Sequence, residues 1–230
     1  MYNFLRLVYN NTLRPLRSWL IILWRLIIFR VLKGQKTDKY GIKIGYVIRP
    51  NNLHFDDTPN RDEYQDAIYK RVHEFATGKQ MSSIIDIGCG SGFKLLKYFE
   101  KFETIGLELP PALDYLKKNH PERTWIYSDF SFVPEKQFDM AIAVDVIEHL
   151  GDPDPFLNYI RKIKPKYVAL STPDRDTLPY RGRLGPPINK CHVREWAQSE
   201  FVDYVGRYFN LVEVKRIQDH YNFVIGSPKA

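Results

Sequence analysis

The chain has 230 residues, 44% of them hydrophobic, which is enough for one globular domain with a modest extension. Its formal charge of +7 comes from residues 1–37, which hold seven basic residues and no acid, so the remainder is balanced and a polyanionic nucleic-acid partner is disfavoured. Only two cysteines occur, which excludes a disulfide framework and suits a reducing cytoplasm.

Residues 1–35 are basic and apolar, and we predict a helix there. Arg25 interrupts the apolar run, so no stretch reaches the roughly 18 uncharged residues of a spanning helix, and no cleavage site for a secretory signal follows. Arg14, Ser18 and Arg25 form a narrow polar stripe beside a wide apolar surface. This pattern is typical of a helix at an anionic membrane interface, peripheral on the inner face. Packing on the domain, or on a second subunit in a homodimer, is the alternative.

Residues 36–60 are polar and contain glycine, proline and asparagine, which predicts a linker or a lid over a site. The domain itself is expected at residues 61–230. Apolar residues at helical spacing predict a first helix from Arg61 to about Thr77.

A buried strand that breaks into a glycine-rich turn organises the predicted domain. Ile84, Ile85 and Ile87 suit a strand covered on both faces, and Gly88, Gly90 and Gly92 follow at alternate positions. Glycines let the backbone turn tightly and approach a ligand, and the next helix, from near Ser91 to Lys101, points unpaired N–H groups at the turn. Phe93 stands where the dinucleotide fingerprint has its third glycine, so a pyrophosphate ligand is less favoured.

Strands and helices then alternate as in a doubly wound parallel sheet. Further strands are predicted at residues 104–107, 125–127, 140–144, 167–170, 211–217 and 221–225. Glu108 and Asp129 directly follow the second and third strands, at the edge where ligands bind in such sheets. A carboxylate at Glu108 can accept both ribose hydroxyls of an adenosine, Asp129 can accept from the adenine amino group, and the ring of Phe130 can pack on the base.

Four motifs carry a family resemblance, in this order: Asp86 to Gly92, Glu108, Ser128-Asp129, and Asp145 to Leu150. The chain resembles the class I S-adenosylmethionine-dependent methyltransferases over about residues 60–226. The resemblance implies a Rossmann-like, mostly parallel seven-stranded sheet with an antiparallel last strand, helices on both faces, and S-adenosyl-L-methionine as cofactor. The cofactor-binding residues that we predict are Asp86, Gly88, Cys89, Gly90, Gly92, Glu108, Leu109, Asp129, Phe130, Asp145 and Val146.

A narrower likeness lies in residues 171–176, 185–189 and 192–196, which resemble a subgroup of small bacterial methyltransferases associated with surface-polysaccharide assembly. It implies O-methylation of a saccharide or a lipid-linked glycan. Two alternatives stay open: O-methylation of a quinone-like phenol at the membrane, and a non-catalytic binding or scaffold protein that retains the fold. The fold does not choose between acceptors.

Transfer to oxygen needs an aligned nucleophile and a group that accepts its proton. His149 and His192 are the candidate bases, each with a structural hydrogen-bonding role as the alternative, and Glu148 is grouped with them as catalytic. Together with Asp145, these three also resemble the metal-binding set of small-RNA 3′-terminal methyltransferases. A divalent metal is therefore left open, and the prediction does not commit to one.

Overall fold

The computed structural model describes residues 37–50, 53, 56–61, 64–178 and 183–229. The predicted helix at residues 1–35 lies outside the described residues, so its membrane or subunit contact stays a prediction. The chain divides into two compact units, Met1–Tyr46 and Val47–Ala230. In the described part of the first unit, the Asp38 carboxylate accepts the backbone N–H groups of Tyr40 and Ile42 and closes a tight turn. No helix among the described residues has the length and apolarity needed to cross a membrane.

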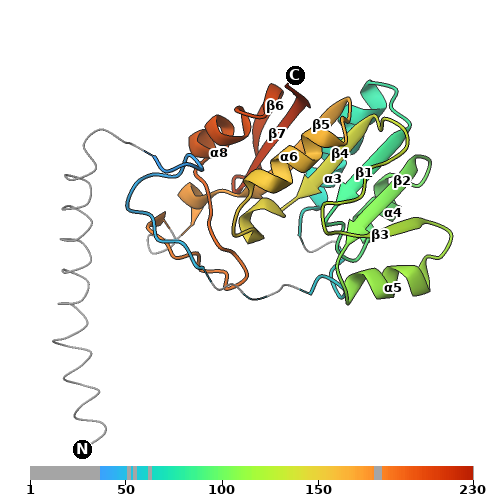
Figure 1. The fold of residues 1–230 in the computed structure, drawn as a ribbon, viewed down its shortest axis with the longest axis horizontal. Helices are drawn as coiled ribbons and strands as arrows, with labels where there is room; N and C mark the ends of the chain where they lie inside the picture. Colours follow the sequence, from blue (N-terminus) through green and yellow to red (C-terminus); the bar gives the residue numbers. More distant parts are fainter. Residues whose placement is uncertain (1–36, 51–52, 54–55, 62–63, 179–182, 230) are drawn as a thin grey trace, which may run out of the picture. The chain divides into compact units, whose positions relative to one another are not determined.

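The second unit is built on one seven-stranded sheet (Figure 1). The strands are β1 (Ser83–Ile87), β2 (Glu103–Glu108), β3 (Thr124–Tyr127), β4 (Met140–Val144), β5 (Tyr167–Pro173), β6 (Phe209–Ile217) and β7 (Tyr221–Pro228). Their order is β3-β2-β1-β4-β5-β7-β6, and β7 runs antiparallel to both of its neighbours while the other pairs are parallel. The predicted Rossmann-like sheet with an antiparallel last strand is confirmed.

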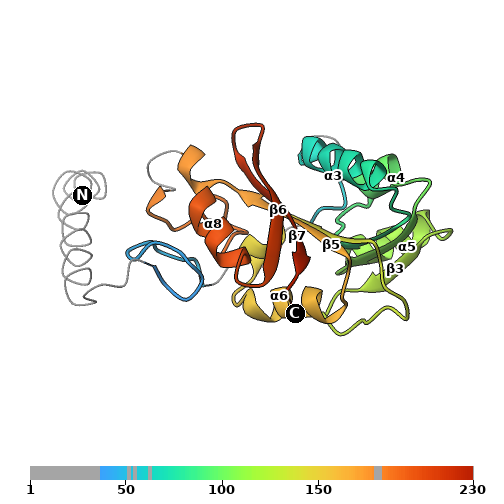
Figure 2. The ribbon, with the colours of Figure 1, turned by 90° about the horizontal axis from the view of Figure 1, so that it is seen from above.

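Helices cover both faces of this sheet. The described helices are α3 (Asp66–Gly78), α4 (Phe93–Tyr98), α5 (Ala112–Asn119), α6 (Asp154–Lys162) and α8 (Gln198–Val205), with short 3-10 helices η2 (Ile147–His149) and η3 (Arg175–Thr177). Figure 2 shows α3 and α4 on one face and α6 on the other. Buried side chains of α3, α4 and α5 form one apolar cluster with side chains of the sheet, which fixes the helices against it.

Helix α3 begins at Asp66 instead of the predicted Arg61. The reason is local: Gln65 has a φ of 66°, a left-handed conformation in which a helix cannot continue toward its N-terminus. A turn precedes it, in which the N–H of Asn60 donates to the carbonyl of Asp57 at 2.9 Å. The described residues of the segment before α3 are not helical, and they bring polar side chains to the sheet edge.

The carboxyl ends of β1, β2 and β4 meet at one edge of the sheet. The chain leaves β1 and β4 toward opposite faces, which creates the crevice where open α/β sheets bind ligands. The glycine-rich turn closes this edge, because the N–H groups of Gly88 and Cys89 both donate to the carbonyl of Leu107 on β2.

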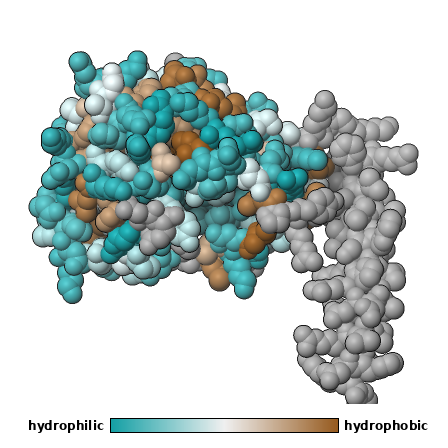
Figure 3. Space-filling model, turned by 180° about the vertical axis from the view of Figure 1, so that it is seen from behind, coloured by the Kyte–Doolittle hydropathy of each residue, from teal (hydrophilic) through white to brown (hydrophobic). Residues whose placement is uncertain are grey.

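The rest of the described surface is ordinary for a water-exposed domain. Figure 3 shows hydrophilic residues over most of one face, with apolar residues in small groups. Exposed apolar side chains include Val47, Ile48, Leu53, Tyr64 and Ile188. Scattered apolar exposure is usual on protein surfaces. Two of these side chains, Leu53 and Tyr64, line the cavities described below.

Candidate active site

A cavity of about 240 Å³, which we call the cofactor cavity, lies at the carboxyl ends of β1, β2 and β4. Its lining residues are Leu53, Asp57, Asn60, Gln65, Tyr69, Gly88, Cys89, Gly90, Ser91, Lys94, Glu108, Leu109, Ser128, Phe130, Val144, Asp145, Val146, His149 and Leu150. The glycine-rich turn forms one wall, the residues that follow β2, β3 and β4 form others, and residues of α3 and of the segment before it also contribute to the lining.

Glu108 organises the wall next to the glycine-rich turn. One of its carboxylate oxygens accepts the N–H of Gly90 at 2.5 Å, and the other accepts the N–H of Leu109 at 2.7 Å. Gly90 has a φ of +57°, and a Cβ there would come within 2.9 Å of the Cβ of Asp57. A side chain at this position would therefore strain the backbone and push Asp57 away.

Eight of the eleven predicted cofactor-binding residues line the cofactor cavity: Gly88, Cys89, Gly90, Glu108, Leu109, Phe130, Asp145 and Val146. The other three lie outside its lining. Gly92 has no room for a side chain, because a Cβ would meet Leu116 at 2.5 Å. Asp129 is exposed and its carboxylate accepts the N–H of Ser131 at 2.9 Å.

Asp86 is the third residue outside the lining. It lies near the carboxyl end of β1, fully buried, and accepts the hydroxyl of Tyr69 at 2.9 Å. Burial raises the pKa of Asp86 to about 8, while the Tyr69 hydrogen bond lowers it in part. Asp86 therefore connects the strand to α3 and supports the turn from behind.

The raised pKa of Asp86 predicts a pH-dependent stability. Between its ordinary value of 3.8 and about 8, the folded chain keeps a proton that the unfolded chain has lost. The free energy of unfolding should then fall as the pH rises, by up to about 1.4 kcal/mol per pH unit from this group. We expect Asp86→Asn, which cannot ionise, to flatten this slope between about pH 5 and 7.

Urea unfolding at a series of pH values measures the slope. Asp129→Asn is the matched control, because hydrogen bonds from Ser131 lower the pKa of Asp129 and its titration falls below this window. An Asp86→Asn slope equal to that of the parent chain would contradict the assignment.

A second cavity of about 230 Å³, which we call the acceptor cavity, adjoins the first. It is lined by Asp57, Asn60, Tyr64, Gln65, Asp145, Glu148, His149, Pro173, Asn189, His192 and Tyr221. The two cavities share Asp57, Asn60, Gln65, Asp145 and His149. A ligand in one cavity can therefore meet a ligand in the other beside these side chains.

Asp145 stands at the junction of the two cavities. Its backbone has a φ of 55°, and its carboxylate accepts the hydroxyl of Ser171 at 2.6 Å and the amide of Gln65 at 3.1 Å. Burial raises the pKa of Asp145, and these two hydrogen bonds oppose the shift. Both oxygens are thus held in fixed directions at the place where the cavities meet.

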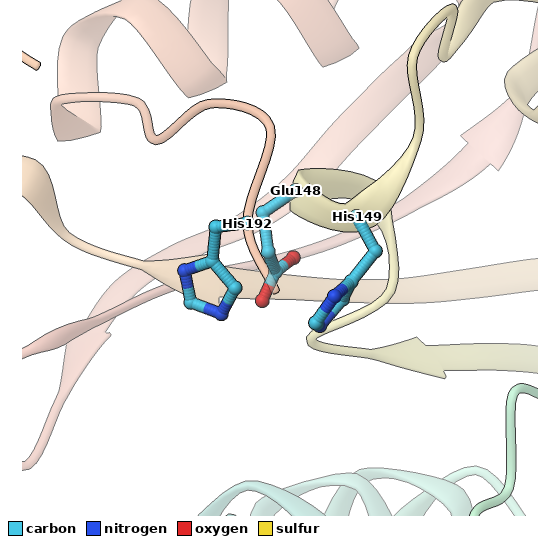
Figure 4. A group of neighbouring side chains, drawn as sticks. All are labelled: Glu148, His149 and His192. Carbon is cyan, nitrogen blue, oxygen red and sulfur yellow. The ribbon is translucent and has the colours of Figure 1, made fainter. Parts of the chain in front are cut away.

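The three predicted catalytic residues come together in the acceptor cavity, although they come from two segments. Glu148 and His149 lie on η2 and His192 lies in the segment after η3, and Figure 4 shows the three side chains converging. Their potential ligand atoms all lie within 4.8 Å of one another. Burial raises the pKa of Glu148 well above its usual range, and the charge of Asp145 adds to the shift.

Each histidine of this group is oriented by its Nδ1 atom. The Nδ1 of His149 lies 2.9 Å from the carbonyl oxygen of Cys191, which can only accept, so this nitrogen carries the hydrogen. The Nδ1 of His192 lies 2.7 Å from the carboxylate of Glu195. In the neutral rings Nε2 then carries the lone pair, and in His192 this atom lies 3.0 Å from the side-chain nitrogen of Asn189.

Sequence reasoning missed Asp57, Asn60 and Gln65, which line both cavities, and Tyr69 and Lys94, which line the first. The signal for Asp57 and Asn60 was the polar composition of residues 36–60, whereas Gln65 fell within the helix predicted from Arg61 to about Thr77. Tyr69 and Lys94 lie on helices whose apolar spacing indicated packing, and neither was distinguishable from a packing residue.

The lining fits S-adenosylmethionine. Glu108 offers a carboxylate to ribose hydroxyls and Phe130 an aromatic face to adenine, while Gly88 and Gly90 bring backbone without a side chain to the cavity wall, where the methionine portion can approach it. A carboxylate has about four lone-pair sites, so Glu108 can accept further hydrogen bonds beside the two it already receives.

Among curated proteins, the chain is similar to the ubiquinone biosynthesis O-methyltransferase of Rickettsia bellii, with 26% identity over 151 residues. The match covers 62% of this chain and 61% of that protein, so this chain spans less than two thirds of the length of that relative.

Two solved structures share the fold. A protein of Pyrococcus horikoshii OT3 matches with a TM-score of 0.57 and 20% identity, over 74% of this chain and 93% of that one. The N-methyltransferase NodS of Bradyrhizobium japonicum WM9, in complex with S-adenosyl-L-homocysteine, matches with a TM-score of 0.55 and 15% identity, over 76% and 95%. The model of a family described as a methyltransferase domain matches residues 61–227. The chain therefore belongs to this methyltransferase-domain family, and its cofactor is S-adenosylmethionine.

Proposed function

We propose that this protein is an O-methyltransferase that acts on a hydroxyl group of a saccharide or a lipid-linked glycan, with residues 61–230 as the catalytic domain. The observation that carries the proposal is the chemistry of the acceptor cavity. Its described lining contains no lysine or arginine, but several side chains that hydrogen-bond and two tyrosine rings. Such a lining suits a neutral ligand that is rich in hydroxyl groups.

The residue roles follow from the two cavities. We assign the predicted cofactor-binding residues that line the cofactor cavity to direct contact, with Glu108 on the ribose and Phe130 on the adenine. Asp86 and Gly92 support the turn from behind. A contact between Asp129 and the adenine amino group stays a prediction, because this side chain lies outside the cavity lining.

Methyl transfer requires an acceptor oxygen aligned with the methyl group and a base that takes one proton from that oxygen. S-adenosylmethionine supplies a methyl group already activated by its sulfonium. The acceptor oxygen forms a bond to the methyl carbon, the carbon–sulfur bond breaks, and the electron pair stays on sulfur. The junction beside Asp145 brings the oxygen in line, and His192 or His149 takes the proton at Nε2. Glu148 lies beside both rings in the acceptor cavity.

A quinone-like phenol is the second candidate acceptor. It is favoured by the name of the Rickettsia bellii relative, a ubiquinone biosynthesis O-methyltransferase. For this acceptor, the predicted helix at residues 1–35 would serve as a membrane tether. A scaffold role without catalysis is the remaining alternative, and it requires no cofactor binding.

Methyl transfer from S-adenosylmethionine with a labelled methyl group tests the proposal on three matched acceptors: a neutral glycoside, the corresponding uronic acid, and a catechol. We expect the neutral glycoside to be methylated and the uronic acid to react at least about tenfold more slowly, since the described lining offers acids and no cation to its carboxylate. Preference for the catechol would favour the second candidate. Failure of well-folded protein to bind S-adenosylhomocysteine would overturn both enzyme functions.

A further inference from the structure

We propose that Glu148, His149 and His192 form a binding site for one divalent first-row metal ion that opens into the acceptor cavity. The ligand atoms of the three side chains already lie within 4.8 Å of one another (Figure 4). In a tetrahedral shell, two ligands about 2.0–2.2 Å from the same ion stand about 3.3–3.6 Å apart. The most widely separated pair would thus have to approach by at most about 1.5 Å.

The histidines are oriented as metal ligands are. A ligating histidine donates its second ring N–H to a carbonyl or a carboxylate, which fixes the tautomer and the direction of the ring. His149 does this through Nδ1 to the carbonyl of Cys191 at 2.9 Å, and His192 through Nδ1 to Glu195 at 2.7 Å. The side-chain nitrogen of Asn189 lies 3.0 Å from the Nε2 of His192, and a bound ion would displace this contact.

Glu148 is a buried acid whose charged form a bound ion would stabilise. Its side chain is fully buried, and neither carboxylate oxygen has a hydrogen bond of normal geometry. The neighbouring Thr172 hydroxyl offsets the cost of burial only in part. A buried carboxylate without partners is costly, and coordination of a cation removes that cost.

Asp145 does not join this group, although the sequence pattern placed it in the same set. Its two oxygens are turned toward Ser171 and Gln65. The ligand set is therefore two imidazoles and one carboxylate, which suits Mn²⁺, Fe²⁺, Co²⁺ or Zn²⁺ and leaves coordination positions open. Those positions face the cavity that we assign to the acceptor, where the ion would act as a Lewis acid toward a hydroxyl.

The metal site rests on the proposed function in one respect only, namely the assignment of this cavity to the methyl acceptor. With a metal bound, His149 and His192 are metal ligands instead of proton acceptors. Glu195 is then a positioning residue, because it orients the ring of His192. Metal binding itself can be measured without an acceptor.

The experiment is titration of the EDTA-treated, full-length chain with Mn²⁺, with the free ion followed by electron paramagnetic resonance. We expect one ion per chain, and affinities more than about 100-fold lower for Glu148→Gln and His192→Ala. Glu195→Gln should lower the affinity by about 10–100-fold, because it disturbs only the orientation of His192. His73→Ala on α3 and His220→Ala, which remove histidines outside the cavity lining, should bind as the parent chain does.

Neither Glu148 nor His192 lines the cofactor cavity, so binding of S-adenosylhomocysteine by their variants shows that they are folded. Absence of stoichiometric Mn²⁺ binding, or equal binding by His192→Ala, would overturn the site. Methyl transfer at an unchanged rate in EDTA would overturn it as well, while leaving the proposed function and the base role of the histidines in place.

Discussion

Replacement of Glu108 by alanine is expected to weaken the binding of S-adenosylhomocysteine by about 100-fold or more. Two effects add in this variant. The ribose hydroxyls lose hydrogen bonds to a charged acceptor, which contribute about 1.5–3 kcal/mol each. The N–H groups of Gly90 and Leu109 lose the carboxylate that now fixes them, so the glycine-rich turn is less preorganised for the ligand.

Calorimetric titration of the purified chain measures this effect. Glu103→Ala is the matched control, because Glu103 starts the same strand but is exposed and pairs with Lys136 at the other end. We expect the control to bind within about twofold of the parent chain. Comparable losses in both variants would show that the strand as a whole, and not the Glu108 carboxylate, determines the affinity.

The sheet and the cofactor cavity were largely predictable because their determinants are local. The run Ile84 to Ile87 reads as a buried strand, the glycines follow directly, and Glu108 and Asp145 directly follow strands. In a parallel sheet the carboxyl ends of neighbouring strands meet at one edge. Residues at these positions therefore lie close together, and this does not depend on the conformation of the loops between the strands.

The acceptor side was less predictable because its residues converge through irregular segments. Asp57 and Asn60 reach the cavities from a turn, and Gln65 does so through a left-handed backbone conformation. Neither feature has a hydrophobic period that would reveal it in the sequence. For Asp129, the sequence predicted the position directly after β3 but not the direction of the side chain, which accepts the N–H of Ser131.

The segment after β5 shows how a charged pattern can be structural. Asp174, Arg175 and Arg194 carry charges that could either contact the acceptor or hold the segment together. Asp174 pairs with Arg216, Arg175 with Glu200, and Arg194 donates to the carbonyl of Gly151. These contacts favour the second role, and they hold in place the segment that carries His192.

Replacement of Glu200 by alanine is expected to lower the free energy of unfolding by about 3–5 kcal/mol, because the buried guanidinium of Arg175 loses its carboxylate. Glu200 also accepts the N–H of Ala197 at the start of α8, at 3.0 Å. Urea unfolding measures the loss. Glu103→Ala, which breaks an exposed pair, should cost less than about 1 kcal/mol.

The double variant Arg175→Met, Glu200→Leu distinguishes a desolvated charge from a general packing defect. Removal of both charges leaves no unpaired ion, so we expect it to be more stable than Glu200→Ala by roughly 2 kcal/mol or more. Arg175 also donates to the carbonyl of Glu195 at 3.1 Å, and Glu195 orients His192. The double variant should therefore still bind S-adenosylhomocysteine, because the contacts of the glycine-rich turn are unchanged. It should transfer methyl groups more slowly, because the segment that carries Glu195 and His192 is no longer held by Arg175. A double variant as unstable as Glu200→Ala would mean that packing, and not the charge pair, holds this segment.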